Sequence, residues 1–79
     1  MNARRPRPAP RLSPLARLRI LKGLTQEQLA VAIGMDRGEL SRIERGIRPL
    51  TPTKLTKIAR VLRCSSRELA AQLEELAHG

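Results

Sequence analysis

Apolar residues recur at helical spacing along most of the chain, and no segment alternates apolar and polar residues as a half-buried strand does. The clearest stripes follow residues 52–62 and 66–77, at the i, i+3, i+4 and i+7 spacing of one helix face. They are Leu55, Ile58, Ala59 and Leu62 in the first segment and Leu69, Leu73, Leu76 and Ala77 in the second. The pattern predicts an all-α fold.

Capping residues divide the chain into five helices. Each expected start has a Ser, Thr or Asp N-cap, followed either by proline at the first helical position or by Glu or Gln three residues later in a capping box. The N-caps are Ser13, Thr25, Asp36, Thr51 and Ser65, with boxes completed by Gln28, Glu39 and Glu68. We predict helices over about 14–22, 25–33, 36–45, 52–62 and 66–77, with Gly23, Gly34 and Gly46 as the left-handed residues that end the first three.

Hydrophobic staples support these starts. In a staple, the apolar residue before the cap packs against an apolar residue of the new helix. The pairs are Leu24 with Leu29, Met35 with Leu40, Leu50 with Leu55, and Cys64 with Leu69. The last pair predicts a packing role for the only cysteine.

The chain divides into an arm and one small domain. Residues 1–12 are rich in arginine and proline, a composition typical of a flexible segment without a core. The arm contains four arginines that could contact DNA phosphates or enter a minor groove, as basic arms of other proteins do. They are Arg4, Arg5, Arg7 and Arg11. Residues 13–79 form the domain, and a domain of this size buries only about 60% of its unfolded surface, so its stability margin is thin.

The charge is strongly basic and uneven. The net charge is +9, yet residues 68–79 contain only acidic charges, so the excess of basic residues lies before them. Such a charge favours a polyanionic partner, although a merely soluble basic surface remains an alternative. The chain has no Phe, Tyr or Trp, which argues against the aromatic stacking platforms that bind single-stranded nucleic acid.

Several classes of function lack the residues that they need. With Cys64 as the only cysteine and His78 as the only histidine, we expect no disulfide, metal site or cofactor. Titratable residues do not cluster at catalytic spacing, so we expect no enzyme. No apolar run is long enough for a membrane span or a signal peptide, and we expect a cytoplasmic, nucleoid-associated protein.

Residues 25–46 have the pattern of a helix-turn-helix. Only Gly34 and Met35 separate two short predicted helices, which must therefore cross steeply. The sequence over residues 12–69 resembles the lambda-repressor-like (XRE/Cro-type) helix-turn-helix domains, most specifically in GLTQEQLA, in the Gly34 turn and in LSRIERG. The resemblance implies a five-helix DNA-binding domain whose second helix of the motif enters the major groove.

The resemblance also assigns roles to the outer face of that recognition helix. The candidate base-reading residues are Arg37, Gly38, Ser41 and Arg42. Arg37 and Arg42 match positions that reach base edges in the family, and the arginine fork suits guanine. Non-specific phosphate contact is the alternative for both. Gly38 departs from the family pattern, in which a longer side chain often reads a base.

Four further residues match phosphate-binding positions: Thr25, Gln26, Arg45 and Arg48. For Gln26 the physics agrees, because free N–H groups at a helix start attract an anion, although plain capping is the alternative. Glu39 has two candidate roles, which are capping the recognition helix and accepting a bond from a cytosine amine.

A buried ion pair is implied as well. Glu44 shares a helix face with Leu40 and Ile47, so it is expected to point inward. Arg19 matches the inward-facing arginine of the family, which implies a partly buried Arg19–Glu44 pair. Two separate surface charges are the alternative.

These features predict a sequence-specific regulator that binds double-stranded DNA, acts as a repressor or autoregulator and binds a palindromic operator as a homodimer. The dimer surface could come from Ile20 and Leu21 or from the apolar stripe of the last helix, unless these residues pack within the chain. The alternative function is an antitoxin or adaptor module whose main partner is a protein, such as a toxin or the transcription machinery.

Overall fold

The structure, a computed structural model, describes residues 12–78, and its regular secondary structure there is entirely helical. The helices are α1 (Pro14–Leu21), α2 (Gln26–Ala32), α3 (Arg37–Glu44), α4 (Pro52–Val61) and α5 (Ser66–His78). Each predicted helix is present, with ends displaced by at most one residue, which confirms the five-helix all-α fold. The arginines of the predicted arm lie outside the described residues.

The predicted caps begin these helices. Ser13, Thr25, Asp36 and Thr51 each accept a backbone N–H of the first turn through their side chains. Ser65 and Glu68 form a reciprocal capping box, with bonds of 3.0 and 2.9 Å. Because the Glu68 carboxylate accepts the backbone N–H of Ser65, the pKa of Glu68 is lowered from its ordinary value.

Asp36 caps α3 as predicted, but the capping box predicted for Asp36 and Glu39 is wrong, because neither of its two bonds forms. Asp36 Oδ2 accepts the N–H of Gly38 at 2.9 Å, one residue earlier than a box requires. Glu39 accepts a bond from Lys54 of α4 at 3.2 Å. The ammonium group attracts the carboxylate away from the helix start, so the acid links α3 to α4.

A glycine turn sets the angle between α2 and α3. Gly34 has φ +68°, a left-handed conformation that side chains with a Cβ rarely adopt. The turn closes with a bond from Met35 N to Ala30 O of 2.8 Å. Gly23 and Gly46 are left-handed as predicted, whereas after α4 this conformation falls on Arg63, at φ +61°.

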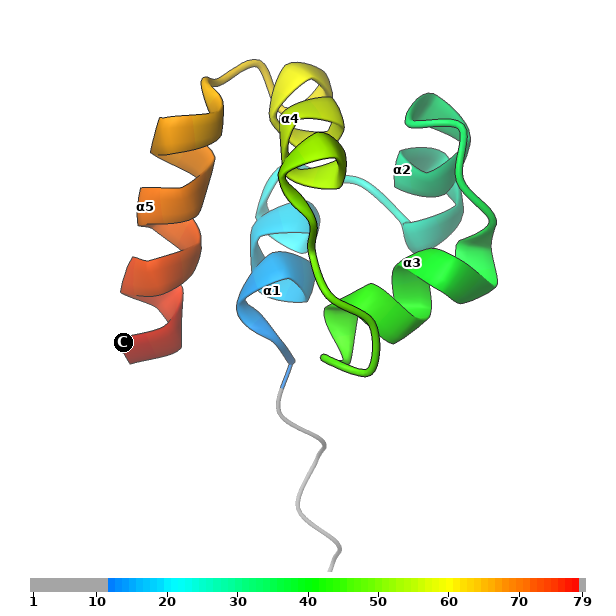
Figure 1. Ribbon diagram of the computed structural model, residues 1–79, viewed down its shortest axis with the longest axis horizontal. Helices are drawn as coiled ribbons and strands as arrows, with labels where there is room; N and C mark the ends of the chain where they lie inside the picture. The colour runs from blue at the N-terminus through cyan, green and yellow to red at the C-terminus, as the bar shows by residue number, and fades with distance from the viewer. Residues whose placement is uncertain (1–11, 79) are drawn as a thin grey trace, which may run out of the picture.

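All five helices contribute to one aliphatic core (Figure 1). The largest fully buried side chains come one each from α2 to α5: Leu29, Leu40, Ile58 and Leu69. Helix α1 lies in the middle, with α5 packed against it and against α4, and with α3 packed against α1 and α2 (Figure 1). This arrangement leaves the outer face of α3 uncovered by the rest of the described chain.

The apolar residues outside the core settle some of the packing alternatives. The apolar stripe of α5 packs within the domain, because Leu73 and Leu76 contact the core. Ala77, which was predicted to belong to this stripe, is exposed instead. Cys64 also packs there, as the staple predicts. Ile20 and Leu21 are 49% and 73% exposed, so packing against the other residues between 12 and 78 does not account for them. Between residues 12 and 78, no helix combines the length and the apolar character needed to cross a membrane.

Candidate nucleic-acid interface

Helix α3 presents one continuous ridge outward. Its buried side consists of Leu40, Ile43 and Glu44, which hold the helix against the core. Gly38, Arg42 and the following Arg45 lie on the opposite side at the i, i+4 and i+7 spacing of one face. The ridge therefore consists of a glycine without a side chain followed by two long basic side chains. The packed inner face holds the helix that carries it in place.

The glycine on this ridge makes room for its neighbours. A Cβ on Gly38 would lie 2.9 Å from the capping oxygen of Asp36 and 3.7 Å from Nη1 of Arg42. The Arg42 guanidinium thus leans back along the helix, over the position that has no side chain. Arg37, at the first turn of α3, is exposed. Arg37 and Gly38 thus lie in the first turn of α3, and the guanidinium of Arg42, from the last turn, reaches back toward them.

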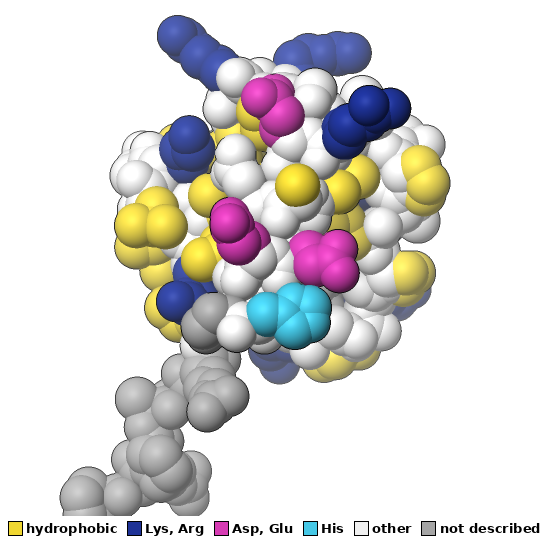
Figure 2. All heavy atoms as spheres, turned by 90° about the vertical axis from the view of Figure 1, so that its left-hand side faces the viewer, with side chains coloured by type: hydrophobic (Ala, Val, Ile, Leu, Met, Phe, Trp, Pro, Cys, Tyr) yellow, Lys and Arg dark blue, Asp and Glu magenta, His cyan; other side chains and the backbone are white. Residues whose placement is uncertain are grey.

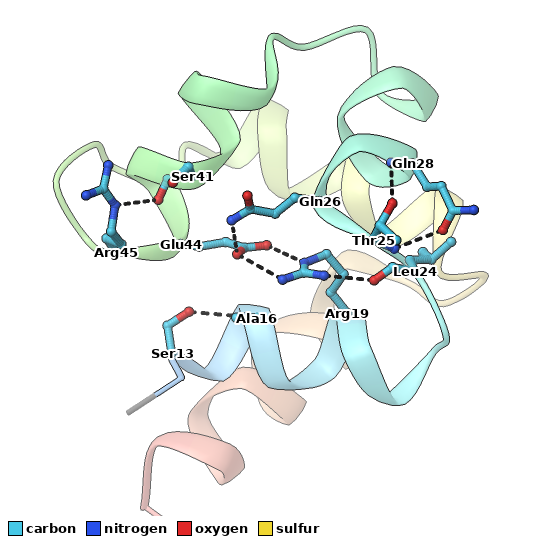
Figure 3. A network of polar contacts seen from close by, with 10 residues as sticks. All are labelled: Ser13, Ala16, Arg19, Leu24, Thr25, Gln26, Gln28, Ser41, Glu44 and Arg45. Carbon is cyan, nitrogen blue, oxygen red and sulfur yellow. Dashed lines mark hydrogen bonds and ion pairs between the residues drawn. The ribbon is translucent and has the colours of Figure 1, made fainter. Parts of the chain in front are cut away.

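A hollow beside α3 brings other candidates together. It is lined by Gln26 at the start of α2, by Ser41 and Arg45, and by Ser13 before α1. Arg45 Nε donates to the Ser41 carbonyl at 3.4 Å, which directs this side chain along the end of α3 (Figure 3). Ser41 thus lies beside Gln26 and Arg45, two of the candidate phosphate ligands, on the flank of the ridge that faces α1 and α2.

The Arg19–Glu44 pair implied by the family resemblance is present and buried (Figure 3). Arg19 Nε lies 2.7 Å from Glu44 Oε2, and the two side chains are only 10% and 4% exposed. A second bond runs from Arg19 Nη1 to the carbonyl of Leu24, at 2.8 Å. One charged pair therefore joins α1, the loop before α2 and the recognition helix.

Gln26 belongs to this network, a contact that the sequence did not reveal. Its Nε2 donates to Glu44 Oε1 at 2.9 Å (Figure 3). The amide therefore fixes the start of α2 to the end of α3, whatever else the glutamine contacts. The Thr25 hydroxyl accepts the N–H of Gln28 at 3.0 Å, so it serves the helix cap.

A second charged cluster was also missed. The Glu39 carboxylate faces Lys54 of α4 at 3.2 Å, Arg42 at 3.8 Å and Arg48 at 4.0 Å. It lies on the flank of α3 that faces α4, away from Gln26. Arg48, the candidate phosphate ligand of the loop, is thereby placed beside Arg42, the candidate base reader.

The opposite side of the molecule has a different electrostatic character. Acidic side chains gather on the face formed by α5 (Figure 2). Among residues 12–78, no three His, Cys, Asp or Glu side chains are grouped closely enough to hold a metal ion. The basic character of the outer side of α3 therefore contrasts with the acidic surface of α5.

Comparison with known proteins agrees with this geometry. A family model described as helix-turn-helix matches residues 15–69, which comprise α1 to α4 and the first turn of α5. A protein of Sinorhizobium fredii, described as an uncharacterized HTH-type transcriptional regulator (y4dJ), is 40% identical over 67 residues, which span 85% of this chain and 87% of that protein. The fold, the turn at Gly34 and these matches together show that the chain belongs to the lambda-repressor-like (XRE-type) helix-turn-helix family.

Proposed function

We propose that the protein is a transcriptional regulator that binds double-stranded DNA in a sequence-specific manner, with α3 in the major groove. The observation that carries this proposal is the ridge of α3, which exposes arginines on a helix fixed to the core by a buried ion pair. The name of its relative in Sinorhizobium fredii, an HTH-type transcriptional regulator, supports the same function. We further propose that it acts as a repressor or autoregulator and is nucleoid-associated.

The residues of the proposed interface form two groups, one that contacts base edges and one that contacts phosphates. Arg37 and Arg42 are proposed to read base edges, because both are exposed. Arg37 lies in the first turn of α3, the end that enters the groove in this class, and the Arg42 guanidinium reaches back toward that end over Gly38. Ser41, which lines the hollow on the flank of the ridge, is proposed to contact a base or the adjacent backbone. The proposed phosphate ligands are Thr25, Gln26, Arg45 and Arg48, which surround α3 and fix its register on the duplex.

We also propose that the protein binds a palindromic operator as a homodimer, because one unit of this size contacts only a short stretch of DNA. Two copies would place their recognition helices about 34 Å apart, in successive turns of the major groove. Ile20 and Leu21 are the proposed contact, because they are large, apolar and exposed at the end of α1. The same two residues favour the alternative in which the main partner is another protein, such as a toxin or a component of the transcription machinery.

The salt dependence of binding tests the proposed function. Because several arginines and a lysine surround α3, we expect the logarithm of the affinity for duplex DNA to fall linearly with the logarithm of the salt concentration. The expected slope is about −3 or steeper, since each neutralised phosphate contributes about −0.9. Fluorescence anisotropy with a labelled duplex at several salt concentrations measures it. A single strand of the same sequence should bind more weakly, because the chain has no aromatic side chains.

A slope near zero, or equal affinity for the single strand and the duplex, contradicts the DNA-binding function. Tight binding to a protein partner combined with a flat salt dependence on DNA would instead support the alternative.

A further inference from the structure

Glu39 is an acidic side chain on a surface proposed to meet DNA. Glu44, the other acid of α3, is buried with Arg19, whereas the Glu39 side chain is 26% exposed. Its carboxylate lies within 4.0 Å of cations from three different elements: Arg42 on α3, Arg48 in the loop and Lys54 on α4. We call these four residues the Glu39 cluster, and one negative charge in it faces three positive charges.

The contacts within the Glu39 cluster differ in kind. Lys54 Nζ donates a hydrogen bond to Glu39 Oε2 at 3.2 Å, which fixes the carboxylate to α4. The two arginines approach at 3.8 and 4.0 Å, beyond the range of a hydrogen bond. Their side chains are 46% and 57% exposed. The acid therefore attracts both guanidinium groups without using their donors, which stay available for DNA.

Stability of the fold does not explain an acid at this place. Asp36 already caps α3, so Glu39 is not needed there. Partly exposed ion pairs also stabilise a fold only slightly. A carboxylate near the phosphate backbone weakens binding to every sequence alike, because it offsets part of the positive charge around it. Its presence is better explained by a gain in selectivity.

We propose that Glu39 is a positioning and selectivity residue for DNA recognition. It lowers the attraction of the cluster for any phosphate backbone, and it holds Arg42 in one orientation, over the space that Gly38 leaves free. Binding then depends more on base contacts and less on charge. The inference rests on the proposed function, in which α3 meets DNA.

The test compares Glu39→Gln with Glu75→Gln, which removes the same charge from an exposed position on α5. Two probes are used: a random-sequence duplex pool, and the duplex that the parent protein enriches from that pool. For Glu39→Gln we expect tighter binding to the random pool, by up to about fivefold, which is the limit for a carboxylate about 4 Å from a phosphate in water. The salt slope should steepen by about 0.9. The affinity ratio between the enriched duplex and the pool should fall, and Glu75→Gln should match the parent protein.

A second variant separates charge from position. Glu39→Asp keeps the charge but shortens the side chain, so its affinity for the random pool should equal that of the parent. Its base preference should broaden at the position read by Arg42. Thermal melting confirms the fold of each variant, and a shift of at most a few degrees is expected for a surface pair.

The inference is overturned if Glu39→Gln and Glu75→Gln have the same affinity for the pool and the same base preference. It is also overturned if Glu39→Asp binds the pool as tightly as Glu39→Gln. Failure of the proposed function has a different signature, because the parent protein itself would then enrich no duplex and show no salt slope.

Discussion

Replacing Glu44 by alanine is expected to destabilise the fold by about 3–5 kcal/mol. The variant leaves the guanidinium of Arg19 charged and nearly buried, with only the carbonyl of Leu24 among its present partners. It also removes the acceptor of the Gln26 amide. In a domain with a thin stability margin, such a loss should unfold much of the population at moderate temperature. Denaturant unfolding followed by circular dichroism measures the change in free energy.

Matched variants identify the cause of that loss. Glu75→Ala removes an exposed carboxylate of α5 and should change the unfolding free energy by no more than about 0.5 kcal/mol. Replacing Arg19 and Glu44 together by leucine should be much less harmful than Glu44→Ala alone, because no unpaired charge then remains buried. If Glu44→Ala unfolds at the denaturant concentration of the parent protein, the pair does not stabilise the fold and this explanation of the network is wrong.

Alanine at Arg37 or Arg42 is expected to cost about 1–3 kcal/mol of binding free energy at the preferred duplex. Each variant should also relax the preference at one base position in each half-site. Arg48→Ala should weaken binding to all sequences about equally, because a phosphate is the same at every base pair. Selection from a randomised duplex pool with the parent and the three variants measures both effects.

The outcome separates base contacts from phosphate contacts. Unchanged preferred sequences in both Arg37→Ala and Arg42→Ala would show that neither arginine reads a base. A changed preference in Arg48→Ala alone would reverse the proposed assignment. Melting curves for all variants serve as the control, and exposed substitutions of this kind should leave the melting temperature nearly unchanged.

Local signals predicted the helices well because their causes are local. A cap, a staple and a closing glycine each act within one or two turns of a helix, so Ser13, Leu24 and Gly34 could be interpreted without knowledge of the rest of the fold. Arg63 is the exception, since nothing in its side chain favours the left-handed conformation that it adopts.

Contacts between elements were harder to predict. Glu44 is buried as expected, yet part of the reasoning was wrong, because Ile47 is 62% exposed. Helix α3 ends at Glu44, so helical periodicity does not extend to Ile47. Leu40, one turn earlier on the same side, is the residue that justifies the prediction.

The polar partners of Glu39 and Gln26 illustrate the same limit. Lys54 is 15 residues from Glu39, across a loop whose path the sequence does not specify. Gln26 and Glu44 are 18 residues apart on two helices that cross. The spacing of Glu39 from Asp36 fitted a capping box, and only the position of α4 reveals the competing lysine. Exposure of Ile20 likewise depends on which side of α1 the other helices cover.

The central claim is that the outward face of α3 is the surface that meets DNA. Titration of the isotope-labelled protein with its enriched duplex, followed by amide chemical shifts, tests this most directly. We predict the largest shift changes along α3, at the start of α2 and around Arg48, with the smallest changes on the acidic face of α5 (Figure 2). Changes concentrated on α5 or at the end of α1, with α3 unaffected, would contradict the claim.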